Sequence, residues 1–269
     1  MIRATAHAKV NFFLEITGKR PDGYHTLSTV FQTISLGDEL SVAPAAKLLL
    51  TCSDRRLPVD ERNLVMKAAM RLQDALKESR GAAIHLEKKV PMGAGLGGGS
   101  ADAAATLQAL LKLWGRRIGV SALKKLAVGL GADVPFFLKG GICAATGIGE
   151  KLKPLKPWPK TWLVLVYPGF GVSTPEAYAK VKLPFASPVT RRRIDKDSTL
   201  FNRFEELVLP DHPELPQLKQ DLLDAGATAS LMSGSGSSVF GMARSHTQGA
   251  QILARIQKKY NQCWLVHTL

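Results

Sequence analysis

PMGAGLGGGSADAAA, residues 91–105, is the stretch of sequence that decides the predicted fold. Five of the seven residues from Gly93 to Gly99 are glycines, which are costly inside a helix or strand and therefore indicate a loop of special geometry. Residues 83–87 read as a strand, and apolar residues after the loop recur at helical spacing up to Trp114. A strand, a loop of bare backbone and a helix N-terminus together suit phosphate groups. We interpret the stretch as a nucleotide-binding loop.

Other kinds of glycine-rich loop fit this stretch less well. Gly93, Gly95 and Gly98 match the dinucleotide fingerprint, but no Asp or Glu lies between Asp102 and Asp133, where that fingerprint requires one. A Walker loop requires a lysine, which this loop lacks, and a protein-kinase loop requires a later His-Arg-Asp run, which the chain lacks. A flexible linker is disfavoured because an alanine-rich helix start follows.

The composition is that of a globular protein with a basic surface. With 269 residues, 45% of them hydrophobic, the chain is long enough for one large domain or two lobes. Its formal net charge of +14 suggests nucleic-acid binding, but the basic residues are spread in pairs such as Lys88-Lys89, and only residues 191–193 are denser. No RNA-binding aromatic pattern or zinc-finger spacing accompanies them. We interpret the scattered lysines as solvated surface charge, whose positive field would also attract anionic small substrates.

Cysteine usage and apolar runs predict a cytoplasmic protein. The three cysteines are far apart and odd in number, which predicts neither a disulfide framework nor a zinc site. The first motif begins by Ala8, which leaves no room for a signal peptide. The longest apolar runs are too short to span a bilayer, so we expect no membrane partner.

Polar residues near the start of the chain are candidates for ligand binding. Residues 5–17 read as a strand on which Lys9 and Asn11 share one face, which suits two donors aimed into a cleft or, alternatively, the solvent face of an edge strand. The turn at residues 21–23 leads into Tyr24 and His25. This pair suits stacking on a planar base or, alternatively, ordinary packing beside a surface histidine.

A further candidate is Asp133, which lies between a helix end and an apolar Pro-Phe-Phe run. A carboxylate in such surroundings is partly desolvated and requires a cationic or hydrogen-bonding partner, although an Asp before a proline turn also commonly caps a helix. We expect Pro135 to hold Val134 in an extended conformation. Residues 230–241 form a second glycine-rich centre, which predicts two strands joined by a turn of small hydroxyl residues that suits a phosphate.

The rest of the chain predicts a mixture of helices and strands. Periodicity predicts helices over residues 63–79, 103–114, 121–130, 175–181, 202–209, 215–225 and 247–260, and strands over 28–36, 39–42, 48–52, 162–167 and 263–267. The Lys- and Pro-rich residues 151–159 predict a linker between two lobes. Residues 184–198 lack a pattern and predict a loop.

Three patches occur along the chain in order: residues 9–11, the glycine loop and residues 232–241. In this respect the chain resembles the GHMP small-molecule kinases, which share these three motifs in that order. Residues 8–11, 18–25 and 131–137 are most similar to the members of the family that act on a cytidine-diphosphate-linked methylerythritol. The resemblance spans nearly the whole chain.

The resemblance implies an α/β (α+β) fold of two lobes, residues 1–153 and 154–269, with the active site in the cleft between them. It implies transfer of the γ-phosphoryl group of ATP to the 2-hydroxyl of the cytidine-diphosphate-linked methylerythritol, in the non-mevalonate (MEP) isoprenoid pathway. Mg²⁺ would accompany ATP, bound mostly through phosphates and water, and no metal ligand is assigned to the protein. We expect a monomer or weak homodimer that binds no nucleic acid.

The resemblance also implies roles for individual residues. Asp133 would be the general base and Lys9 its partner, which keeps the carboxylate ionised. Tyr24 and His25 would hold the cytosine, with Tyr178 as a second stacking face. The full set of implied ATP contacts is Pro91, Gly93, Gly95, Leu96, Gly97, Gly98, Gly99, Ser100, Ala101 and Asn63. The full set of implied substrate contacts is Asn11, Tyr24, His25, Tyr178, Ser233, Gly234 and Ser235. Ala101 departs from relatives, which often carry a second serine there.

Two alternatives stay open. A GHMP kinase for mevalonate, homoserine or galactose would share the glycine loop but lack the Asp-Gly-Tyr-His turn at residues 22–25. A nucleic-acid-binding module would explain the basic charge, but it has no use for a general base in apolar surroundings.

Overall fold

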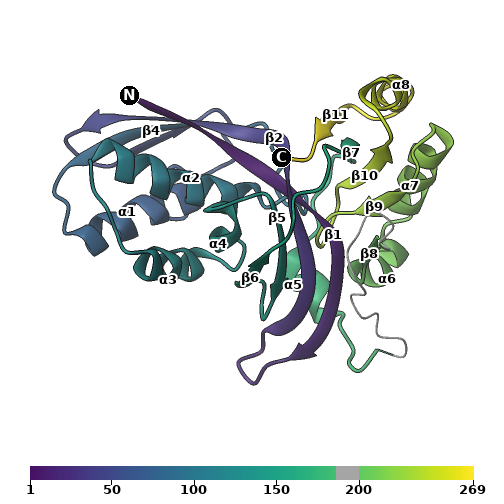
Figure 1. The fold of residues 1–269 in the computed structure, drawn as a ribbon, viewed down its shortest axis with the longest axis horizontal. Coiled ribbons are helices and arrows are strands. Elements are labelled where there is room, and N and C mark those ends of the chain that lie inside the picture. The colour runs from purple at the N-terminus through teal and green to yellow at the C-terminus, as the bar shows by residue number, and fades with distance from the viewer. Residues whose placement is uncertain (186–199) are drawn as a thin grey trace. The chain divides into compact units, whose positions relative to one another are not determined.

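The structure, a computed structural model, describes residues 1–185 and 200–269; the predicted loop at 184–198, with its arginine cluster, lies almost entirely outside the described residues. The chain forms two compact units, whose elements are labelled in Figure 1. The first unit comprises Met1–Ala8, Leu36–Val90 and Gly97–Lys139, and the second comprises Lys9–Ser35, Pro91–Leu96 and Gly140–Leu269. Strands β1 (Ile2–Lys19) and β2 (His25–Ala45) contribute to both units.

The first unit combines strands with a layer of helices. β4 (Gly81–Glu87) lies between β2, to which it is antiparallel with Leu86 opposite Leu40, and β3 (Leu49–Cys52), to which it is parallel. The helices are α1 (Leu64–Leu76), α2 (Gly98–Leu113), α3 (Val120–Leu130) and α4 (Val134–Phe137), drawn in blue to teal in Figure 1. Their apolar faces and those of β2 and β4 form one core, which includes Leu40, Ile84, Leu72, Leu107 and Val134.

Sequence explains why α1 and α2 form a close pair in this core. α1 begins after Asn63, whose Oδ1 accepts a hydrogen bond from the N–H of Val65 at 2.9 Å, as a good N-cap does. α2 is buried along most of its length, and many of its buried residues are alanines. Small side chains allow the backbones of neighbouring helices to approach, while each buried leucine such as Leu107 contributes roughly 1.5–3 kcal/mol to stability.

The second unit contains a four-stranded antiparallel sheet in the order β11-β7-β10-β9. These strands are β7 (Trp162–Tyr167), β9 (Ser230–Met232), β10 (Val239–Ala243) and β11 (Gln262–His267). The apolar run predicted as a buried strand is β7, in which Leu163 to Val166 have no exposed surface. Helices α7 (Glu214–Asp224) and α8 (His246–Ile256) share a core with this sheet.

Further strands of the second unit pair with β1 and β2. β1 pairs in parallel with β8 (Phe201–Asn202), while β2 pairs with β5 (Ile142–Thr146) and β5 with β6 (Lys151–Pro154), both antiparallel. The unit also holds α5 (Thr174–Ala179), α6 (Phe204–Val208) and the short 3-10 helix η1 (Leu209–Asp211). A buried ion pair of 2.7 Å joins Glu15 of β1 to Arg203, just before α6.

Most predicted elements are confirmed, and three expectations are wrong. Residues 28–36 and 39–42 belong to one continuous strand, β2. Val134 is not extended but begins α4, because its N–H bonds to Gly131 and the proline stands in the first turn, where it sacrifices no hydrogen bond. Residues 151–154 form β6 rather than a free linker.

The division into lobes of residues 1–153 and 154–269 stays a prediction. In the part of the chain that the structure describes, no helix is both long and apolar enough to cross a bilayer.

Candidate active site

The glycine loop has the geometry that its sequence predicts. Gly93, Gly95 and Gly97 have φ values of 63°, 72° and 69°, in the left-handed region that other residues rarely adopt. Gly97 is the N-cap of α2, and neither a side-chain cap nor an acidic residue occupies the first turn of that helix. No side chain of that first turn therefore neutralises the positive end of the α2 dipole. This arrangement suits an anionic group such as a phosphate.

In the second unit, segments far apart in sequence meet at Gly95. The carbonyl oxygen of Gly95 accepts hydrogen bonds from Lys9 Nζ and from Ser233 Oγ, both at 2.9 Å. A Cβ atom at Gly95 would lie 1.9 Å from the carbonyl oxygen of Ser233, so only glycine fits. Nearby, the N–H of Ser238 donates to the oxygen of Ala94 at 3.2 Å. The three sequence patches thus contribute to one polar cluster.

Lys9 is the cation of this cluster. Its Nζ donates to Asn11 Oδ1 at 2.7 Å, and Asn11 Nδ2 donates in turn to Thr29 Oγ1 at 2.7 Å. Lys9 and Asn11 are only 4% and 1% exposed. The prediction that the two side chains share a face is confirmed, and the alternative of a solvent-facing strand surface is wrong.

An aromatic pair in the second unit contains two of the residues expected to bind a base. The rings of His25 and Tyr178 stack with centroids 5.2 Å apart and planes 13° from parallel. Partial burial, with the charge of Lys19, lowers the pKa of His25, so its ring is neutral at pH 7. Tyr24, by contrast, is 61% exposed. Ser235, in the second glycine-rich turn, forms a 2.8 Å hydrogen bond with Thr174.

Asp133 lies in the first unit, half-buried and immediately before α4. It does not cap that helix with its side chain, so the capping alternative is wrong. Gly131, two residues earlier, lies beside the first turn of α2, since a Cβ atom there would be 3.8 Å from Ser100 Oγ. The segment that carries the candidate base therefore adjoins the helix N-terminus that suits a phosphate.

Comparison with known proteins fits this geometry. The family described as GHMP kinases N terminal domain matches residues 63–141, which include the glycine loop and Asp133. The family described as GHMP kinases C terminal matches residues 191–262, which include the second glycine-rich turn. The chain is a GHMP kinase.

Two relatives that match this GHMP kinase over nearly its whole length have the same name. It is 41% identical to the 4-diphosphocytidyl-2-C-methyl-D-erythritol kinase of Pelotomaculum thermopropionicum, over 100% of this chain and 98% of that protein. It is 39% identical to the kinase of the same name from Prosthecochloris aestuarii, over 96% and 95% of the two chains. A crystal structure of 4-(cytidine 5'-diphospho)-2C-methyl-D-erythritol kinase matches with a TM-score of 0.88 and 35% identity, over 99% of each chain. The predicted family and GHMP kinase fold are confirmed.

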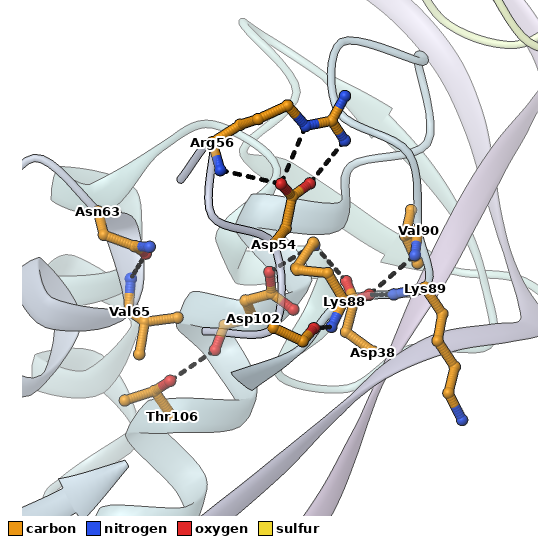
Figure 2. Close-up of polar contacts among 11 residues, drawn as sticks. Asp38, Asp54, Arg56, Asn63, Val65, Lys88, Lys89, Val90, Asp102 and Thr106 are labelled. Atoms are coloured by element: carbon orange, nitrogen blue, oxygen red, sulfur yellow. Dashed lines mark hydrogen bonds and ion pairs between the residues drawn. The ribbon is translucent and has the colours of Figure 1, made fainter. Parts of the chain in front are cut away.

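Beneath α2 of this GHMP kinase lies a charged cluster that sequence reasoning missed, formed by Asp38, Lys88 and Asp102 (Figure 2). Lys88 Nζ donates to Asp38 Oδ2 at 2.5 Å and to Asp102 Oδ2 at 2.9 Å. All three side chains are buried, whereas the side chain of the neighbouring Lys89 pairs with exposed Glu39. The sequence pair Lys88-Lys89 was interpreted as surface charge. The one signal in the sequence was Asp102 itself, an acid within an alanine-rich helix start.

The environment of this cluster shifts its pKa values. Burial, with the charge of Asp38, raises the pKa of Asp102 to about 7, although Lys88 opposes the shift. Burial alone would lower the pKa of Lys88, but the charges of Asp102 and Asp38 outweigh it and raise that pKa, so the ammonium group stays charged. Asp102 Oδ1 has no hydrogen-bond partner among the described residues. An ionised carboxylate is poorly stabilised in such a place.

Two residues expected near ATP have structural roles in this GHMP kinase. Asn63 caps α1 and also donates to the oxygen of Pro58 at 2.8 Å. Ala101 is 2% exposed and packs in the core of the first unit. Their contacts with a nucleotide stay predictions. Among residues 1–185 and 200–269, no group of three or more His, Cys, Asp or Glu side chains could hold a metal ion.

Proposed function

We propose that this GHMP kinase transfers the γ-phosphoryl group of ATP to the 2-hydroxyl of 4-(cytidine 5'-diphospho)-2-C-methyl-D-erythritol, giving the 2-phosphate and ADP, in the non-mevalonate isoprenoid pathway. The observation that carries the proposal is the similarity to 4-diphosphocytidyl-2-C-methyl-D-erythritol kinases over the entire chain, at 41% identity. The Asp-Gly-Tyr-His turn, which the mevalonate, homoserine and galactose kinases are expected to lack, supports the same substrate. The reaction makes this protein a phosphotransferase with an alcohol acceptor.

In the proposed reaction the glycine loop and the N-terminus of α2 hold the phosphates of ATP. The bare backbone from Gly93 to Gly99 and the helix N-terminus, whose first turn has no acidic residue, fit this group. Preorganised N–H groups stabilise the charge that develops on the transferred phosphoryl group. Mg²⁺ would be held mainly by the nucleotide phosphates and water and would neutralise phosphate charge.

Asp133 is the proposed general base, and it accepts the proton of the substrate hydroxyl late in phosphoryl transfer. Such a transfer depends on positioning and charge more than on covalent catalysis, so a carboxylate with an ordinary pKa suffices. Lys9, the proposed partner of Asp133, supplies positive charge that balances the charge that develops during transfer. Its contacts with Asn11 and Gly95 support this role, because they fix the ammonium group within a buried network.

Substrate recognition is assigned to the aromatic and polar residues of the second unit. The neutral ring of His25 offers hydrogen bonds to the edge of the cytosine, while Tyr24 and Tyr178 offer ring faces. Asn11 and the turn formed by Ser233, Gly234 and Ser235 provide donors for the hydroxyl and diphosphate groups. We further propose that the protein acts in the cytoplasm as a monomer or weak homodimer and binds no nucleic acid.

An ADP-release assay tests the proposed substrate. Purified full-length protein receives ATP and Mg²⁺ with the cytidyl-diphospho alcohol, mevalonate or homoserine in parallel reactions. We expect ADP release with the first alcohol alone, and phosphorus NMR of the product should show a new phosphate monoester. Activity with mevalonate or homoserine in place of the first alcohol would assign the chain to another branch of the family.

A further inference from the structure

The cluster of Asp38, Lys88 and Asp102 connects the two ends of the glycine loop. Asp38 Oδ1 accepts hydrogen bonds from the N–H groups of Lys89 at 2.6 Å and Val90 at 2.8 Å, directly before the loop begins. Asp102 lies in α2, directly after the loop ends. Lys88 bridges the two carboxylates, as Figure 2 shows. The loop itself is mostly glycine, so these charged side chains fix its ends.

The ammonium group of Lys88 also lies close to the helix end that suits a phosphate. A Cβ atom at Gly98, the first residue of α2, would lie 3.4 Å from Lys88 Nζ. Asp102 is four residues further along the same helix, about 6 Å along its axis. Charge at the loop and charge in the cluster therefore interact over a short path through protein rather than water.

The net charge of the cluster depends on one proton. With Asp38 ionised, Lys88 charged and Asp102 ionised, the cluster is negative; with Asp102 protonated it is neutral. Charged and titratable groups near the cluster include Lys89, Cys52 and Asp54. Cys52 of β3 has a pKa raised by burial and stays a neutral thiol, and Asp54 is kept ionised by Arg56, which lowers its pKa to about 2. Asp102 is therefore the member that can change charge near neutral pH.

We propose that Asp102 is a proton-linked positioning residue: binding of nucleotide phosphates at the N-terminus of α2 takes up a proton at Asp102, and the neutral cluster then holds the loop. The proton comes from the buffer and goes to a carboxylate oxygen of Asp102, and no other bond changes. This inference rests on the proposed binding of nucleotide at the glycine loop. Its physical basis is Coulomb repulsion, since phosphate charge at this range raises the pKa of a buried carboxyl by about one unit.

Isothermal titration calorimetry of ADP binding tests the inference without any alcohol substrate. Titration of the full-length protein at pH 7.5, in buffers with different ionisation enthalpies, gives the number of protons taken up. We expect wild type to take up about half a proton more than D102N, in which an amide of the same shape carries no charge. The comparison cancels protons that belong to ADP itself. K89M is the matched control, because it removes the adjacent ammonium group and its exposed ion pair with Glu39. Its proton uptake on ADP binding should equal that of wild type.

A pH series on wild type gives a second measurement that does not depend on any variant folding. Between pH 7 and 9, where the charge of ADP is nearly constant, the dissociation constant of ADP should rise about fivefold. The KM for ATP should rise in parallel while kcat stays within about twofold, which a merely structural role of Asp102 would not produce. A flat affinity profile, or equal proton uptake in wild type and D102N, overturns the inference and leaves the proposed function intact. Failure of wild type to bind ADP at all overturns both.

Discussion

At the scale of single residues, the candidate site depends on buried charges that have partners. Lys9 is 4% exposed, and hydrogen bonds to Asn11 Oδ1 and the Gly95 oxygen help to offset the cost of removing its ammonium group from water. Both of these acceptors are neutral, and they fix the position of the ammonium group. The proposed role beside a carboxylate base requires a cation that is fixed in this way.

The role of Asp133 predicts a separation of binding from chemistry. In D133N the amide keeps the shape of the side chain but cannot accept the hydroxyl proton, so turnover should fall at least a hundredfold. ADP affinity should stay within about twofold, because the phosphate contacts are assigned to other residues. Steady-state ADP release and calorimetry measure the two effects. Turnover close to wild type in D133N would contradict the assignment of the base.

The stack of His25 and Tyr178 predicts an effect confined to the cytidyl substrate. In H25A the KM for this substrate should rise about thirtyfold, since an aromatic contact contributes roughly 1 kcal/mol and a hydrogen bond about as much again. The KM for ATP should not change. H212A is a matched control, because His212 stacks on Phe170 with centroids 5.1 Å apart but is not assigned to the substrate. Equal effects of the two variants would argue against a base-binding role for His25.

At the scale of elements, the glycine loop is shaped by contacts that leave no room for side chains. Gly95 faces the turn after β9 so closely that a Cβ atom would overlap the oxygen of Ser233. Asn202 fixes the other side of this turn, because its Nδ2 donates to the oxygens of Met232 at 2.7 Å and Gly234 at 2.8 Å. The loop and the turn are therefore packed against each other as a rigid pair within the second unit.

This packing predicts a large effect for G95A. The methyl group would be 1.9 Å from a backbone oxygen and would also require a φ of 72°, so the loop must move. Unfolding free energy should fall by at least about 3 kcal/mol, and ADP binding should weaken more than tenfold. G115A is the control, since Gly115 has a φ of 60° but no atom within 4 Å of its Cβ position, and it should cost only about 1–2 kcal/mol. Urea unfolding and calorimetry compare the two, and equal losses would rule out the steric explanation.

At the scale of the whole molecule, the sequence predicts those parts of the fold and site that depend on residues close together in the chain. The glycine loop, the shared face of Lys9 and Asn11, and the buried strand β7 each follow from spacing over a few residues. The contact between Gly95 and Ser233 joins residues that are 138 positions apart, and no spacing rule could locate it. Lys88 and Lys89 look alike in sequence, and only the packing of α2 buries one and exposes the other. The sequence predicts an extended Val134 because residues before proline usually avoid the helical region. In the structure Val134 is helical, since it begins α4.

The buried cluster beneath α2 predicts how global stability changes with pH. The pKa of Asp102 is raised to about 7 in the folded protein and is about 3.9 in an unfolded chain. The folded state therefore binds this proton more tightly, so the stabilisation is complete below pH 4 and is lost as pH rises to 7. It amounts to at most about 4 kcal/mol.

Chemical denaturation of wild type and D102N at pH 4, 5, 6, 7 and 8 measures this contribution. The unfolding free energy of D102N, relative to wild type, should increase from pH 4 to pH 7 and then level off. The shape of this difference, rather than its absolute size, is the readout, because the asparagine also changes the contact with Lys88. A difference that does not vary with pH would mean that Asp102 titrates normally.

The interleaved make-up of the two units has a consequence for synthesis on the ribosome. Every residue of the first unit precedes residue 140, so a nascent chain of that length already contains the complete first unit. Residues 9–35 of the second unit emerge early, and β1 pairs with β2, but the outer partners of these strands come late, since Thr29 pairs with Ala145 and Phe13 with Phe201. The outer edges of these two strands must therefore wait unpaired until Ala145 and Phe201 have been translated. A truncation after residue 139 would leave them permanently exposed, so such fragments should aggregate rather than persist as a miniature enzyme.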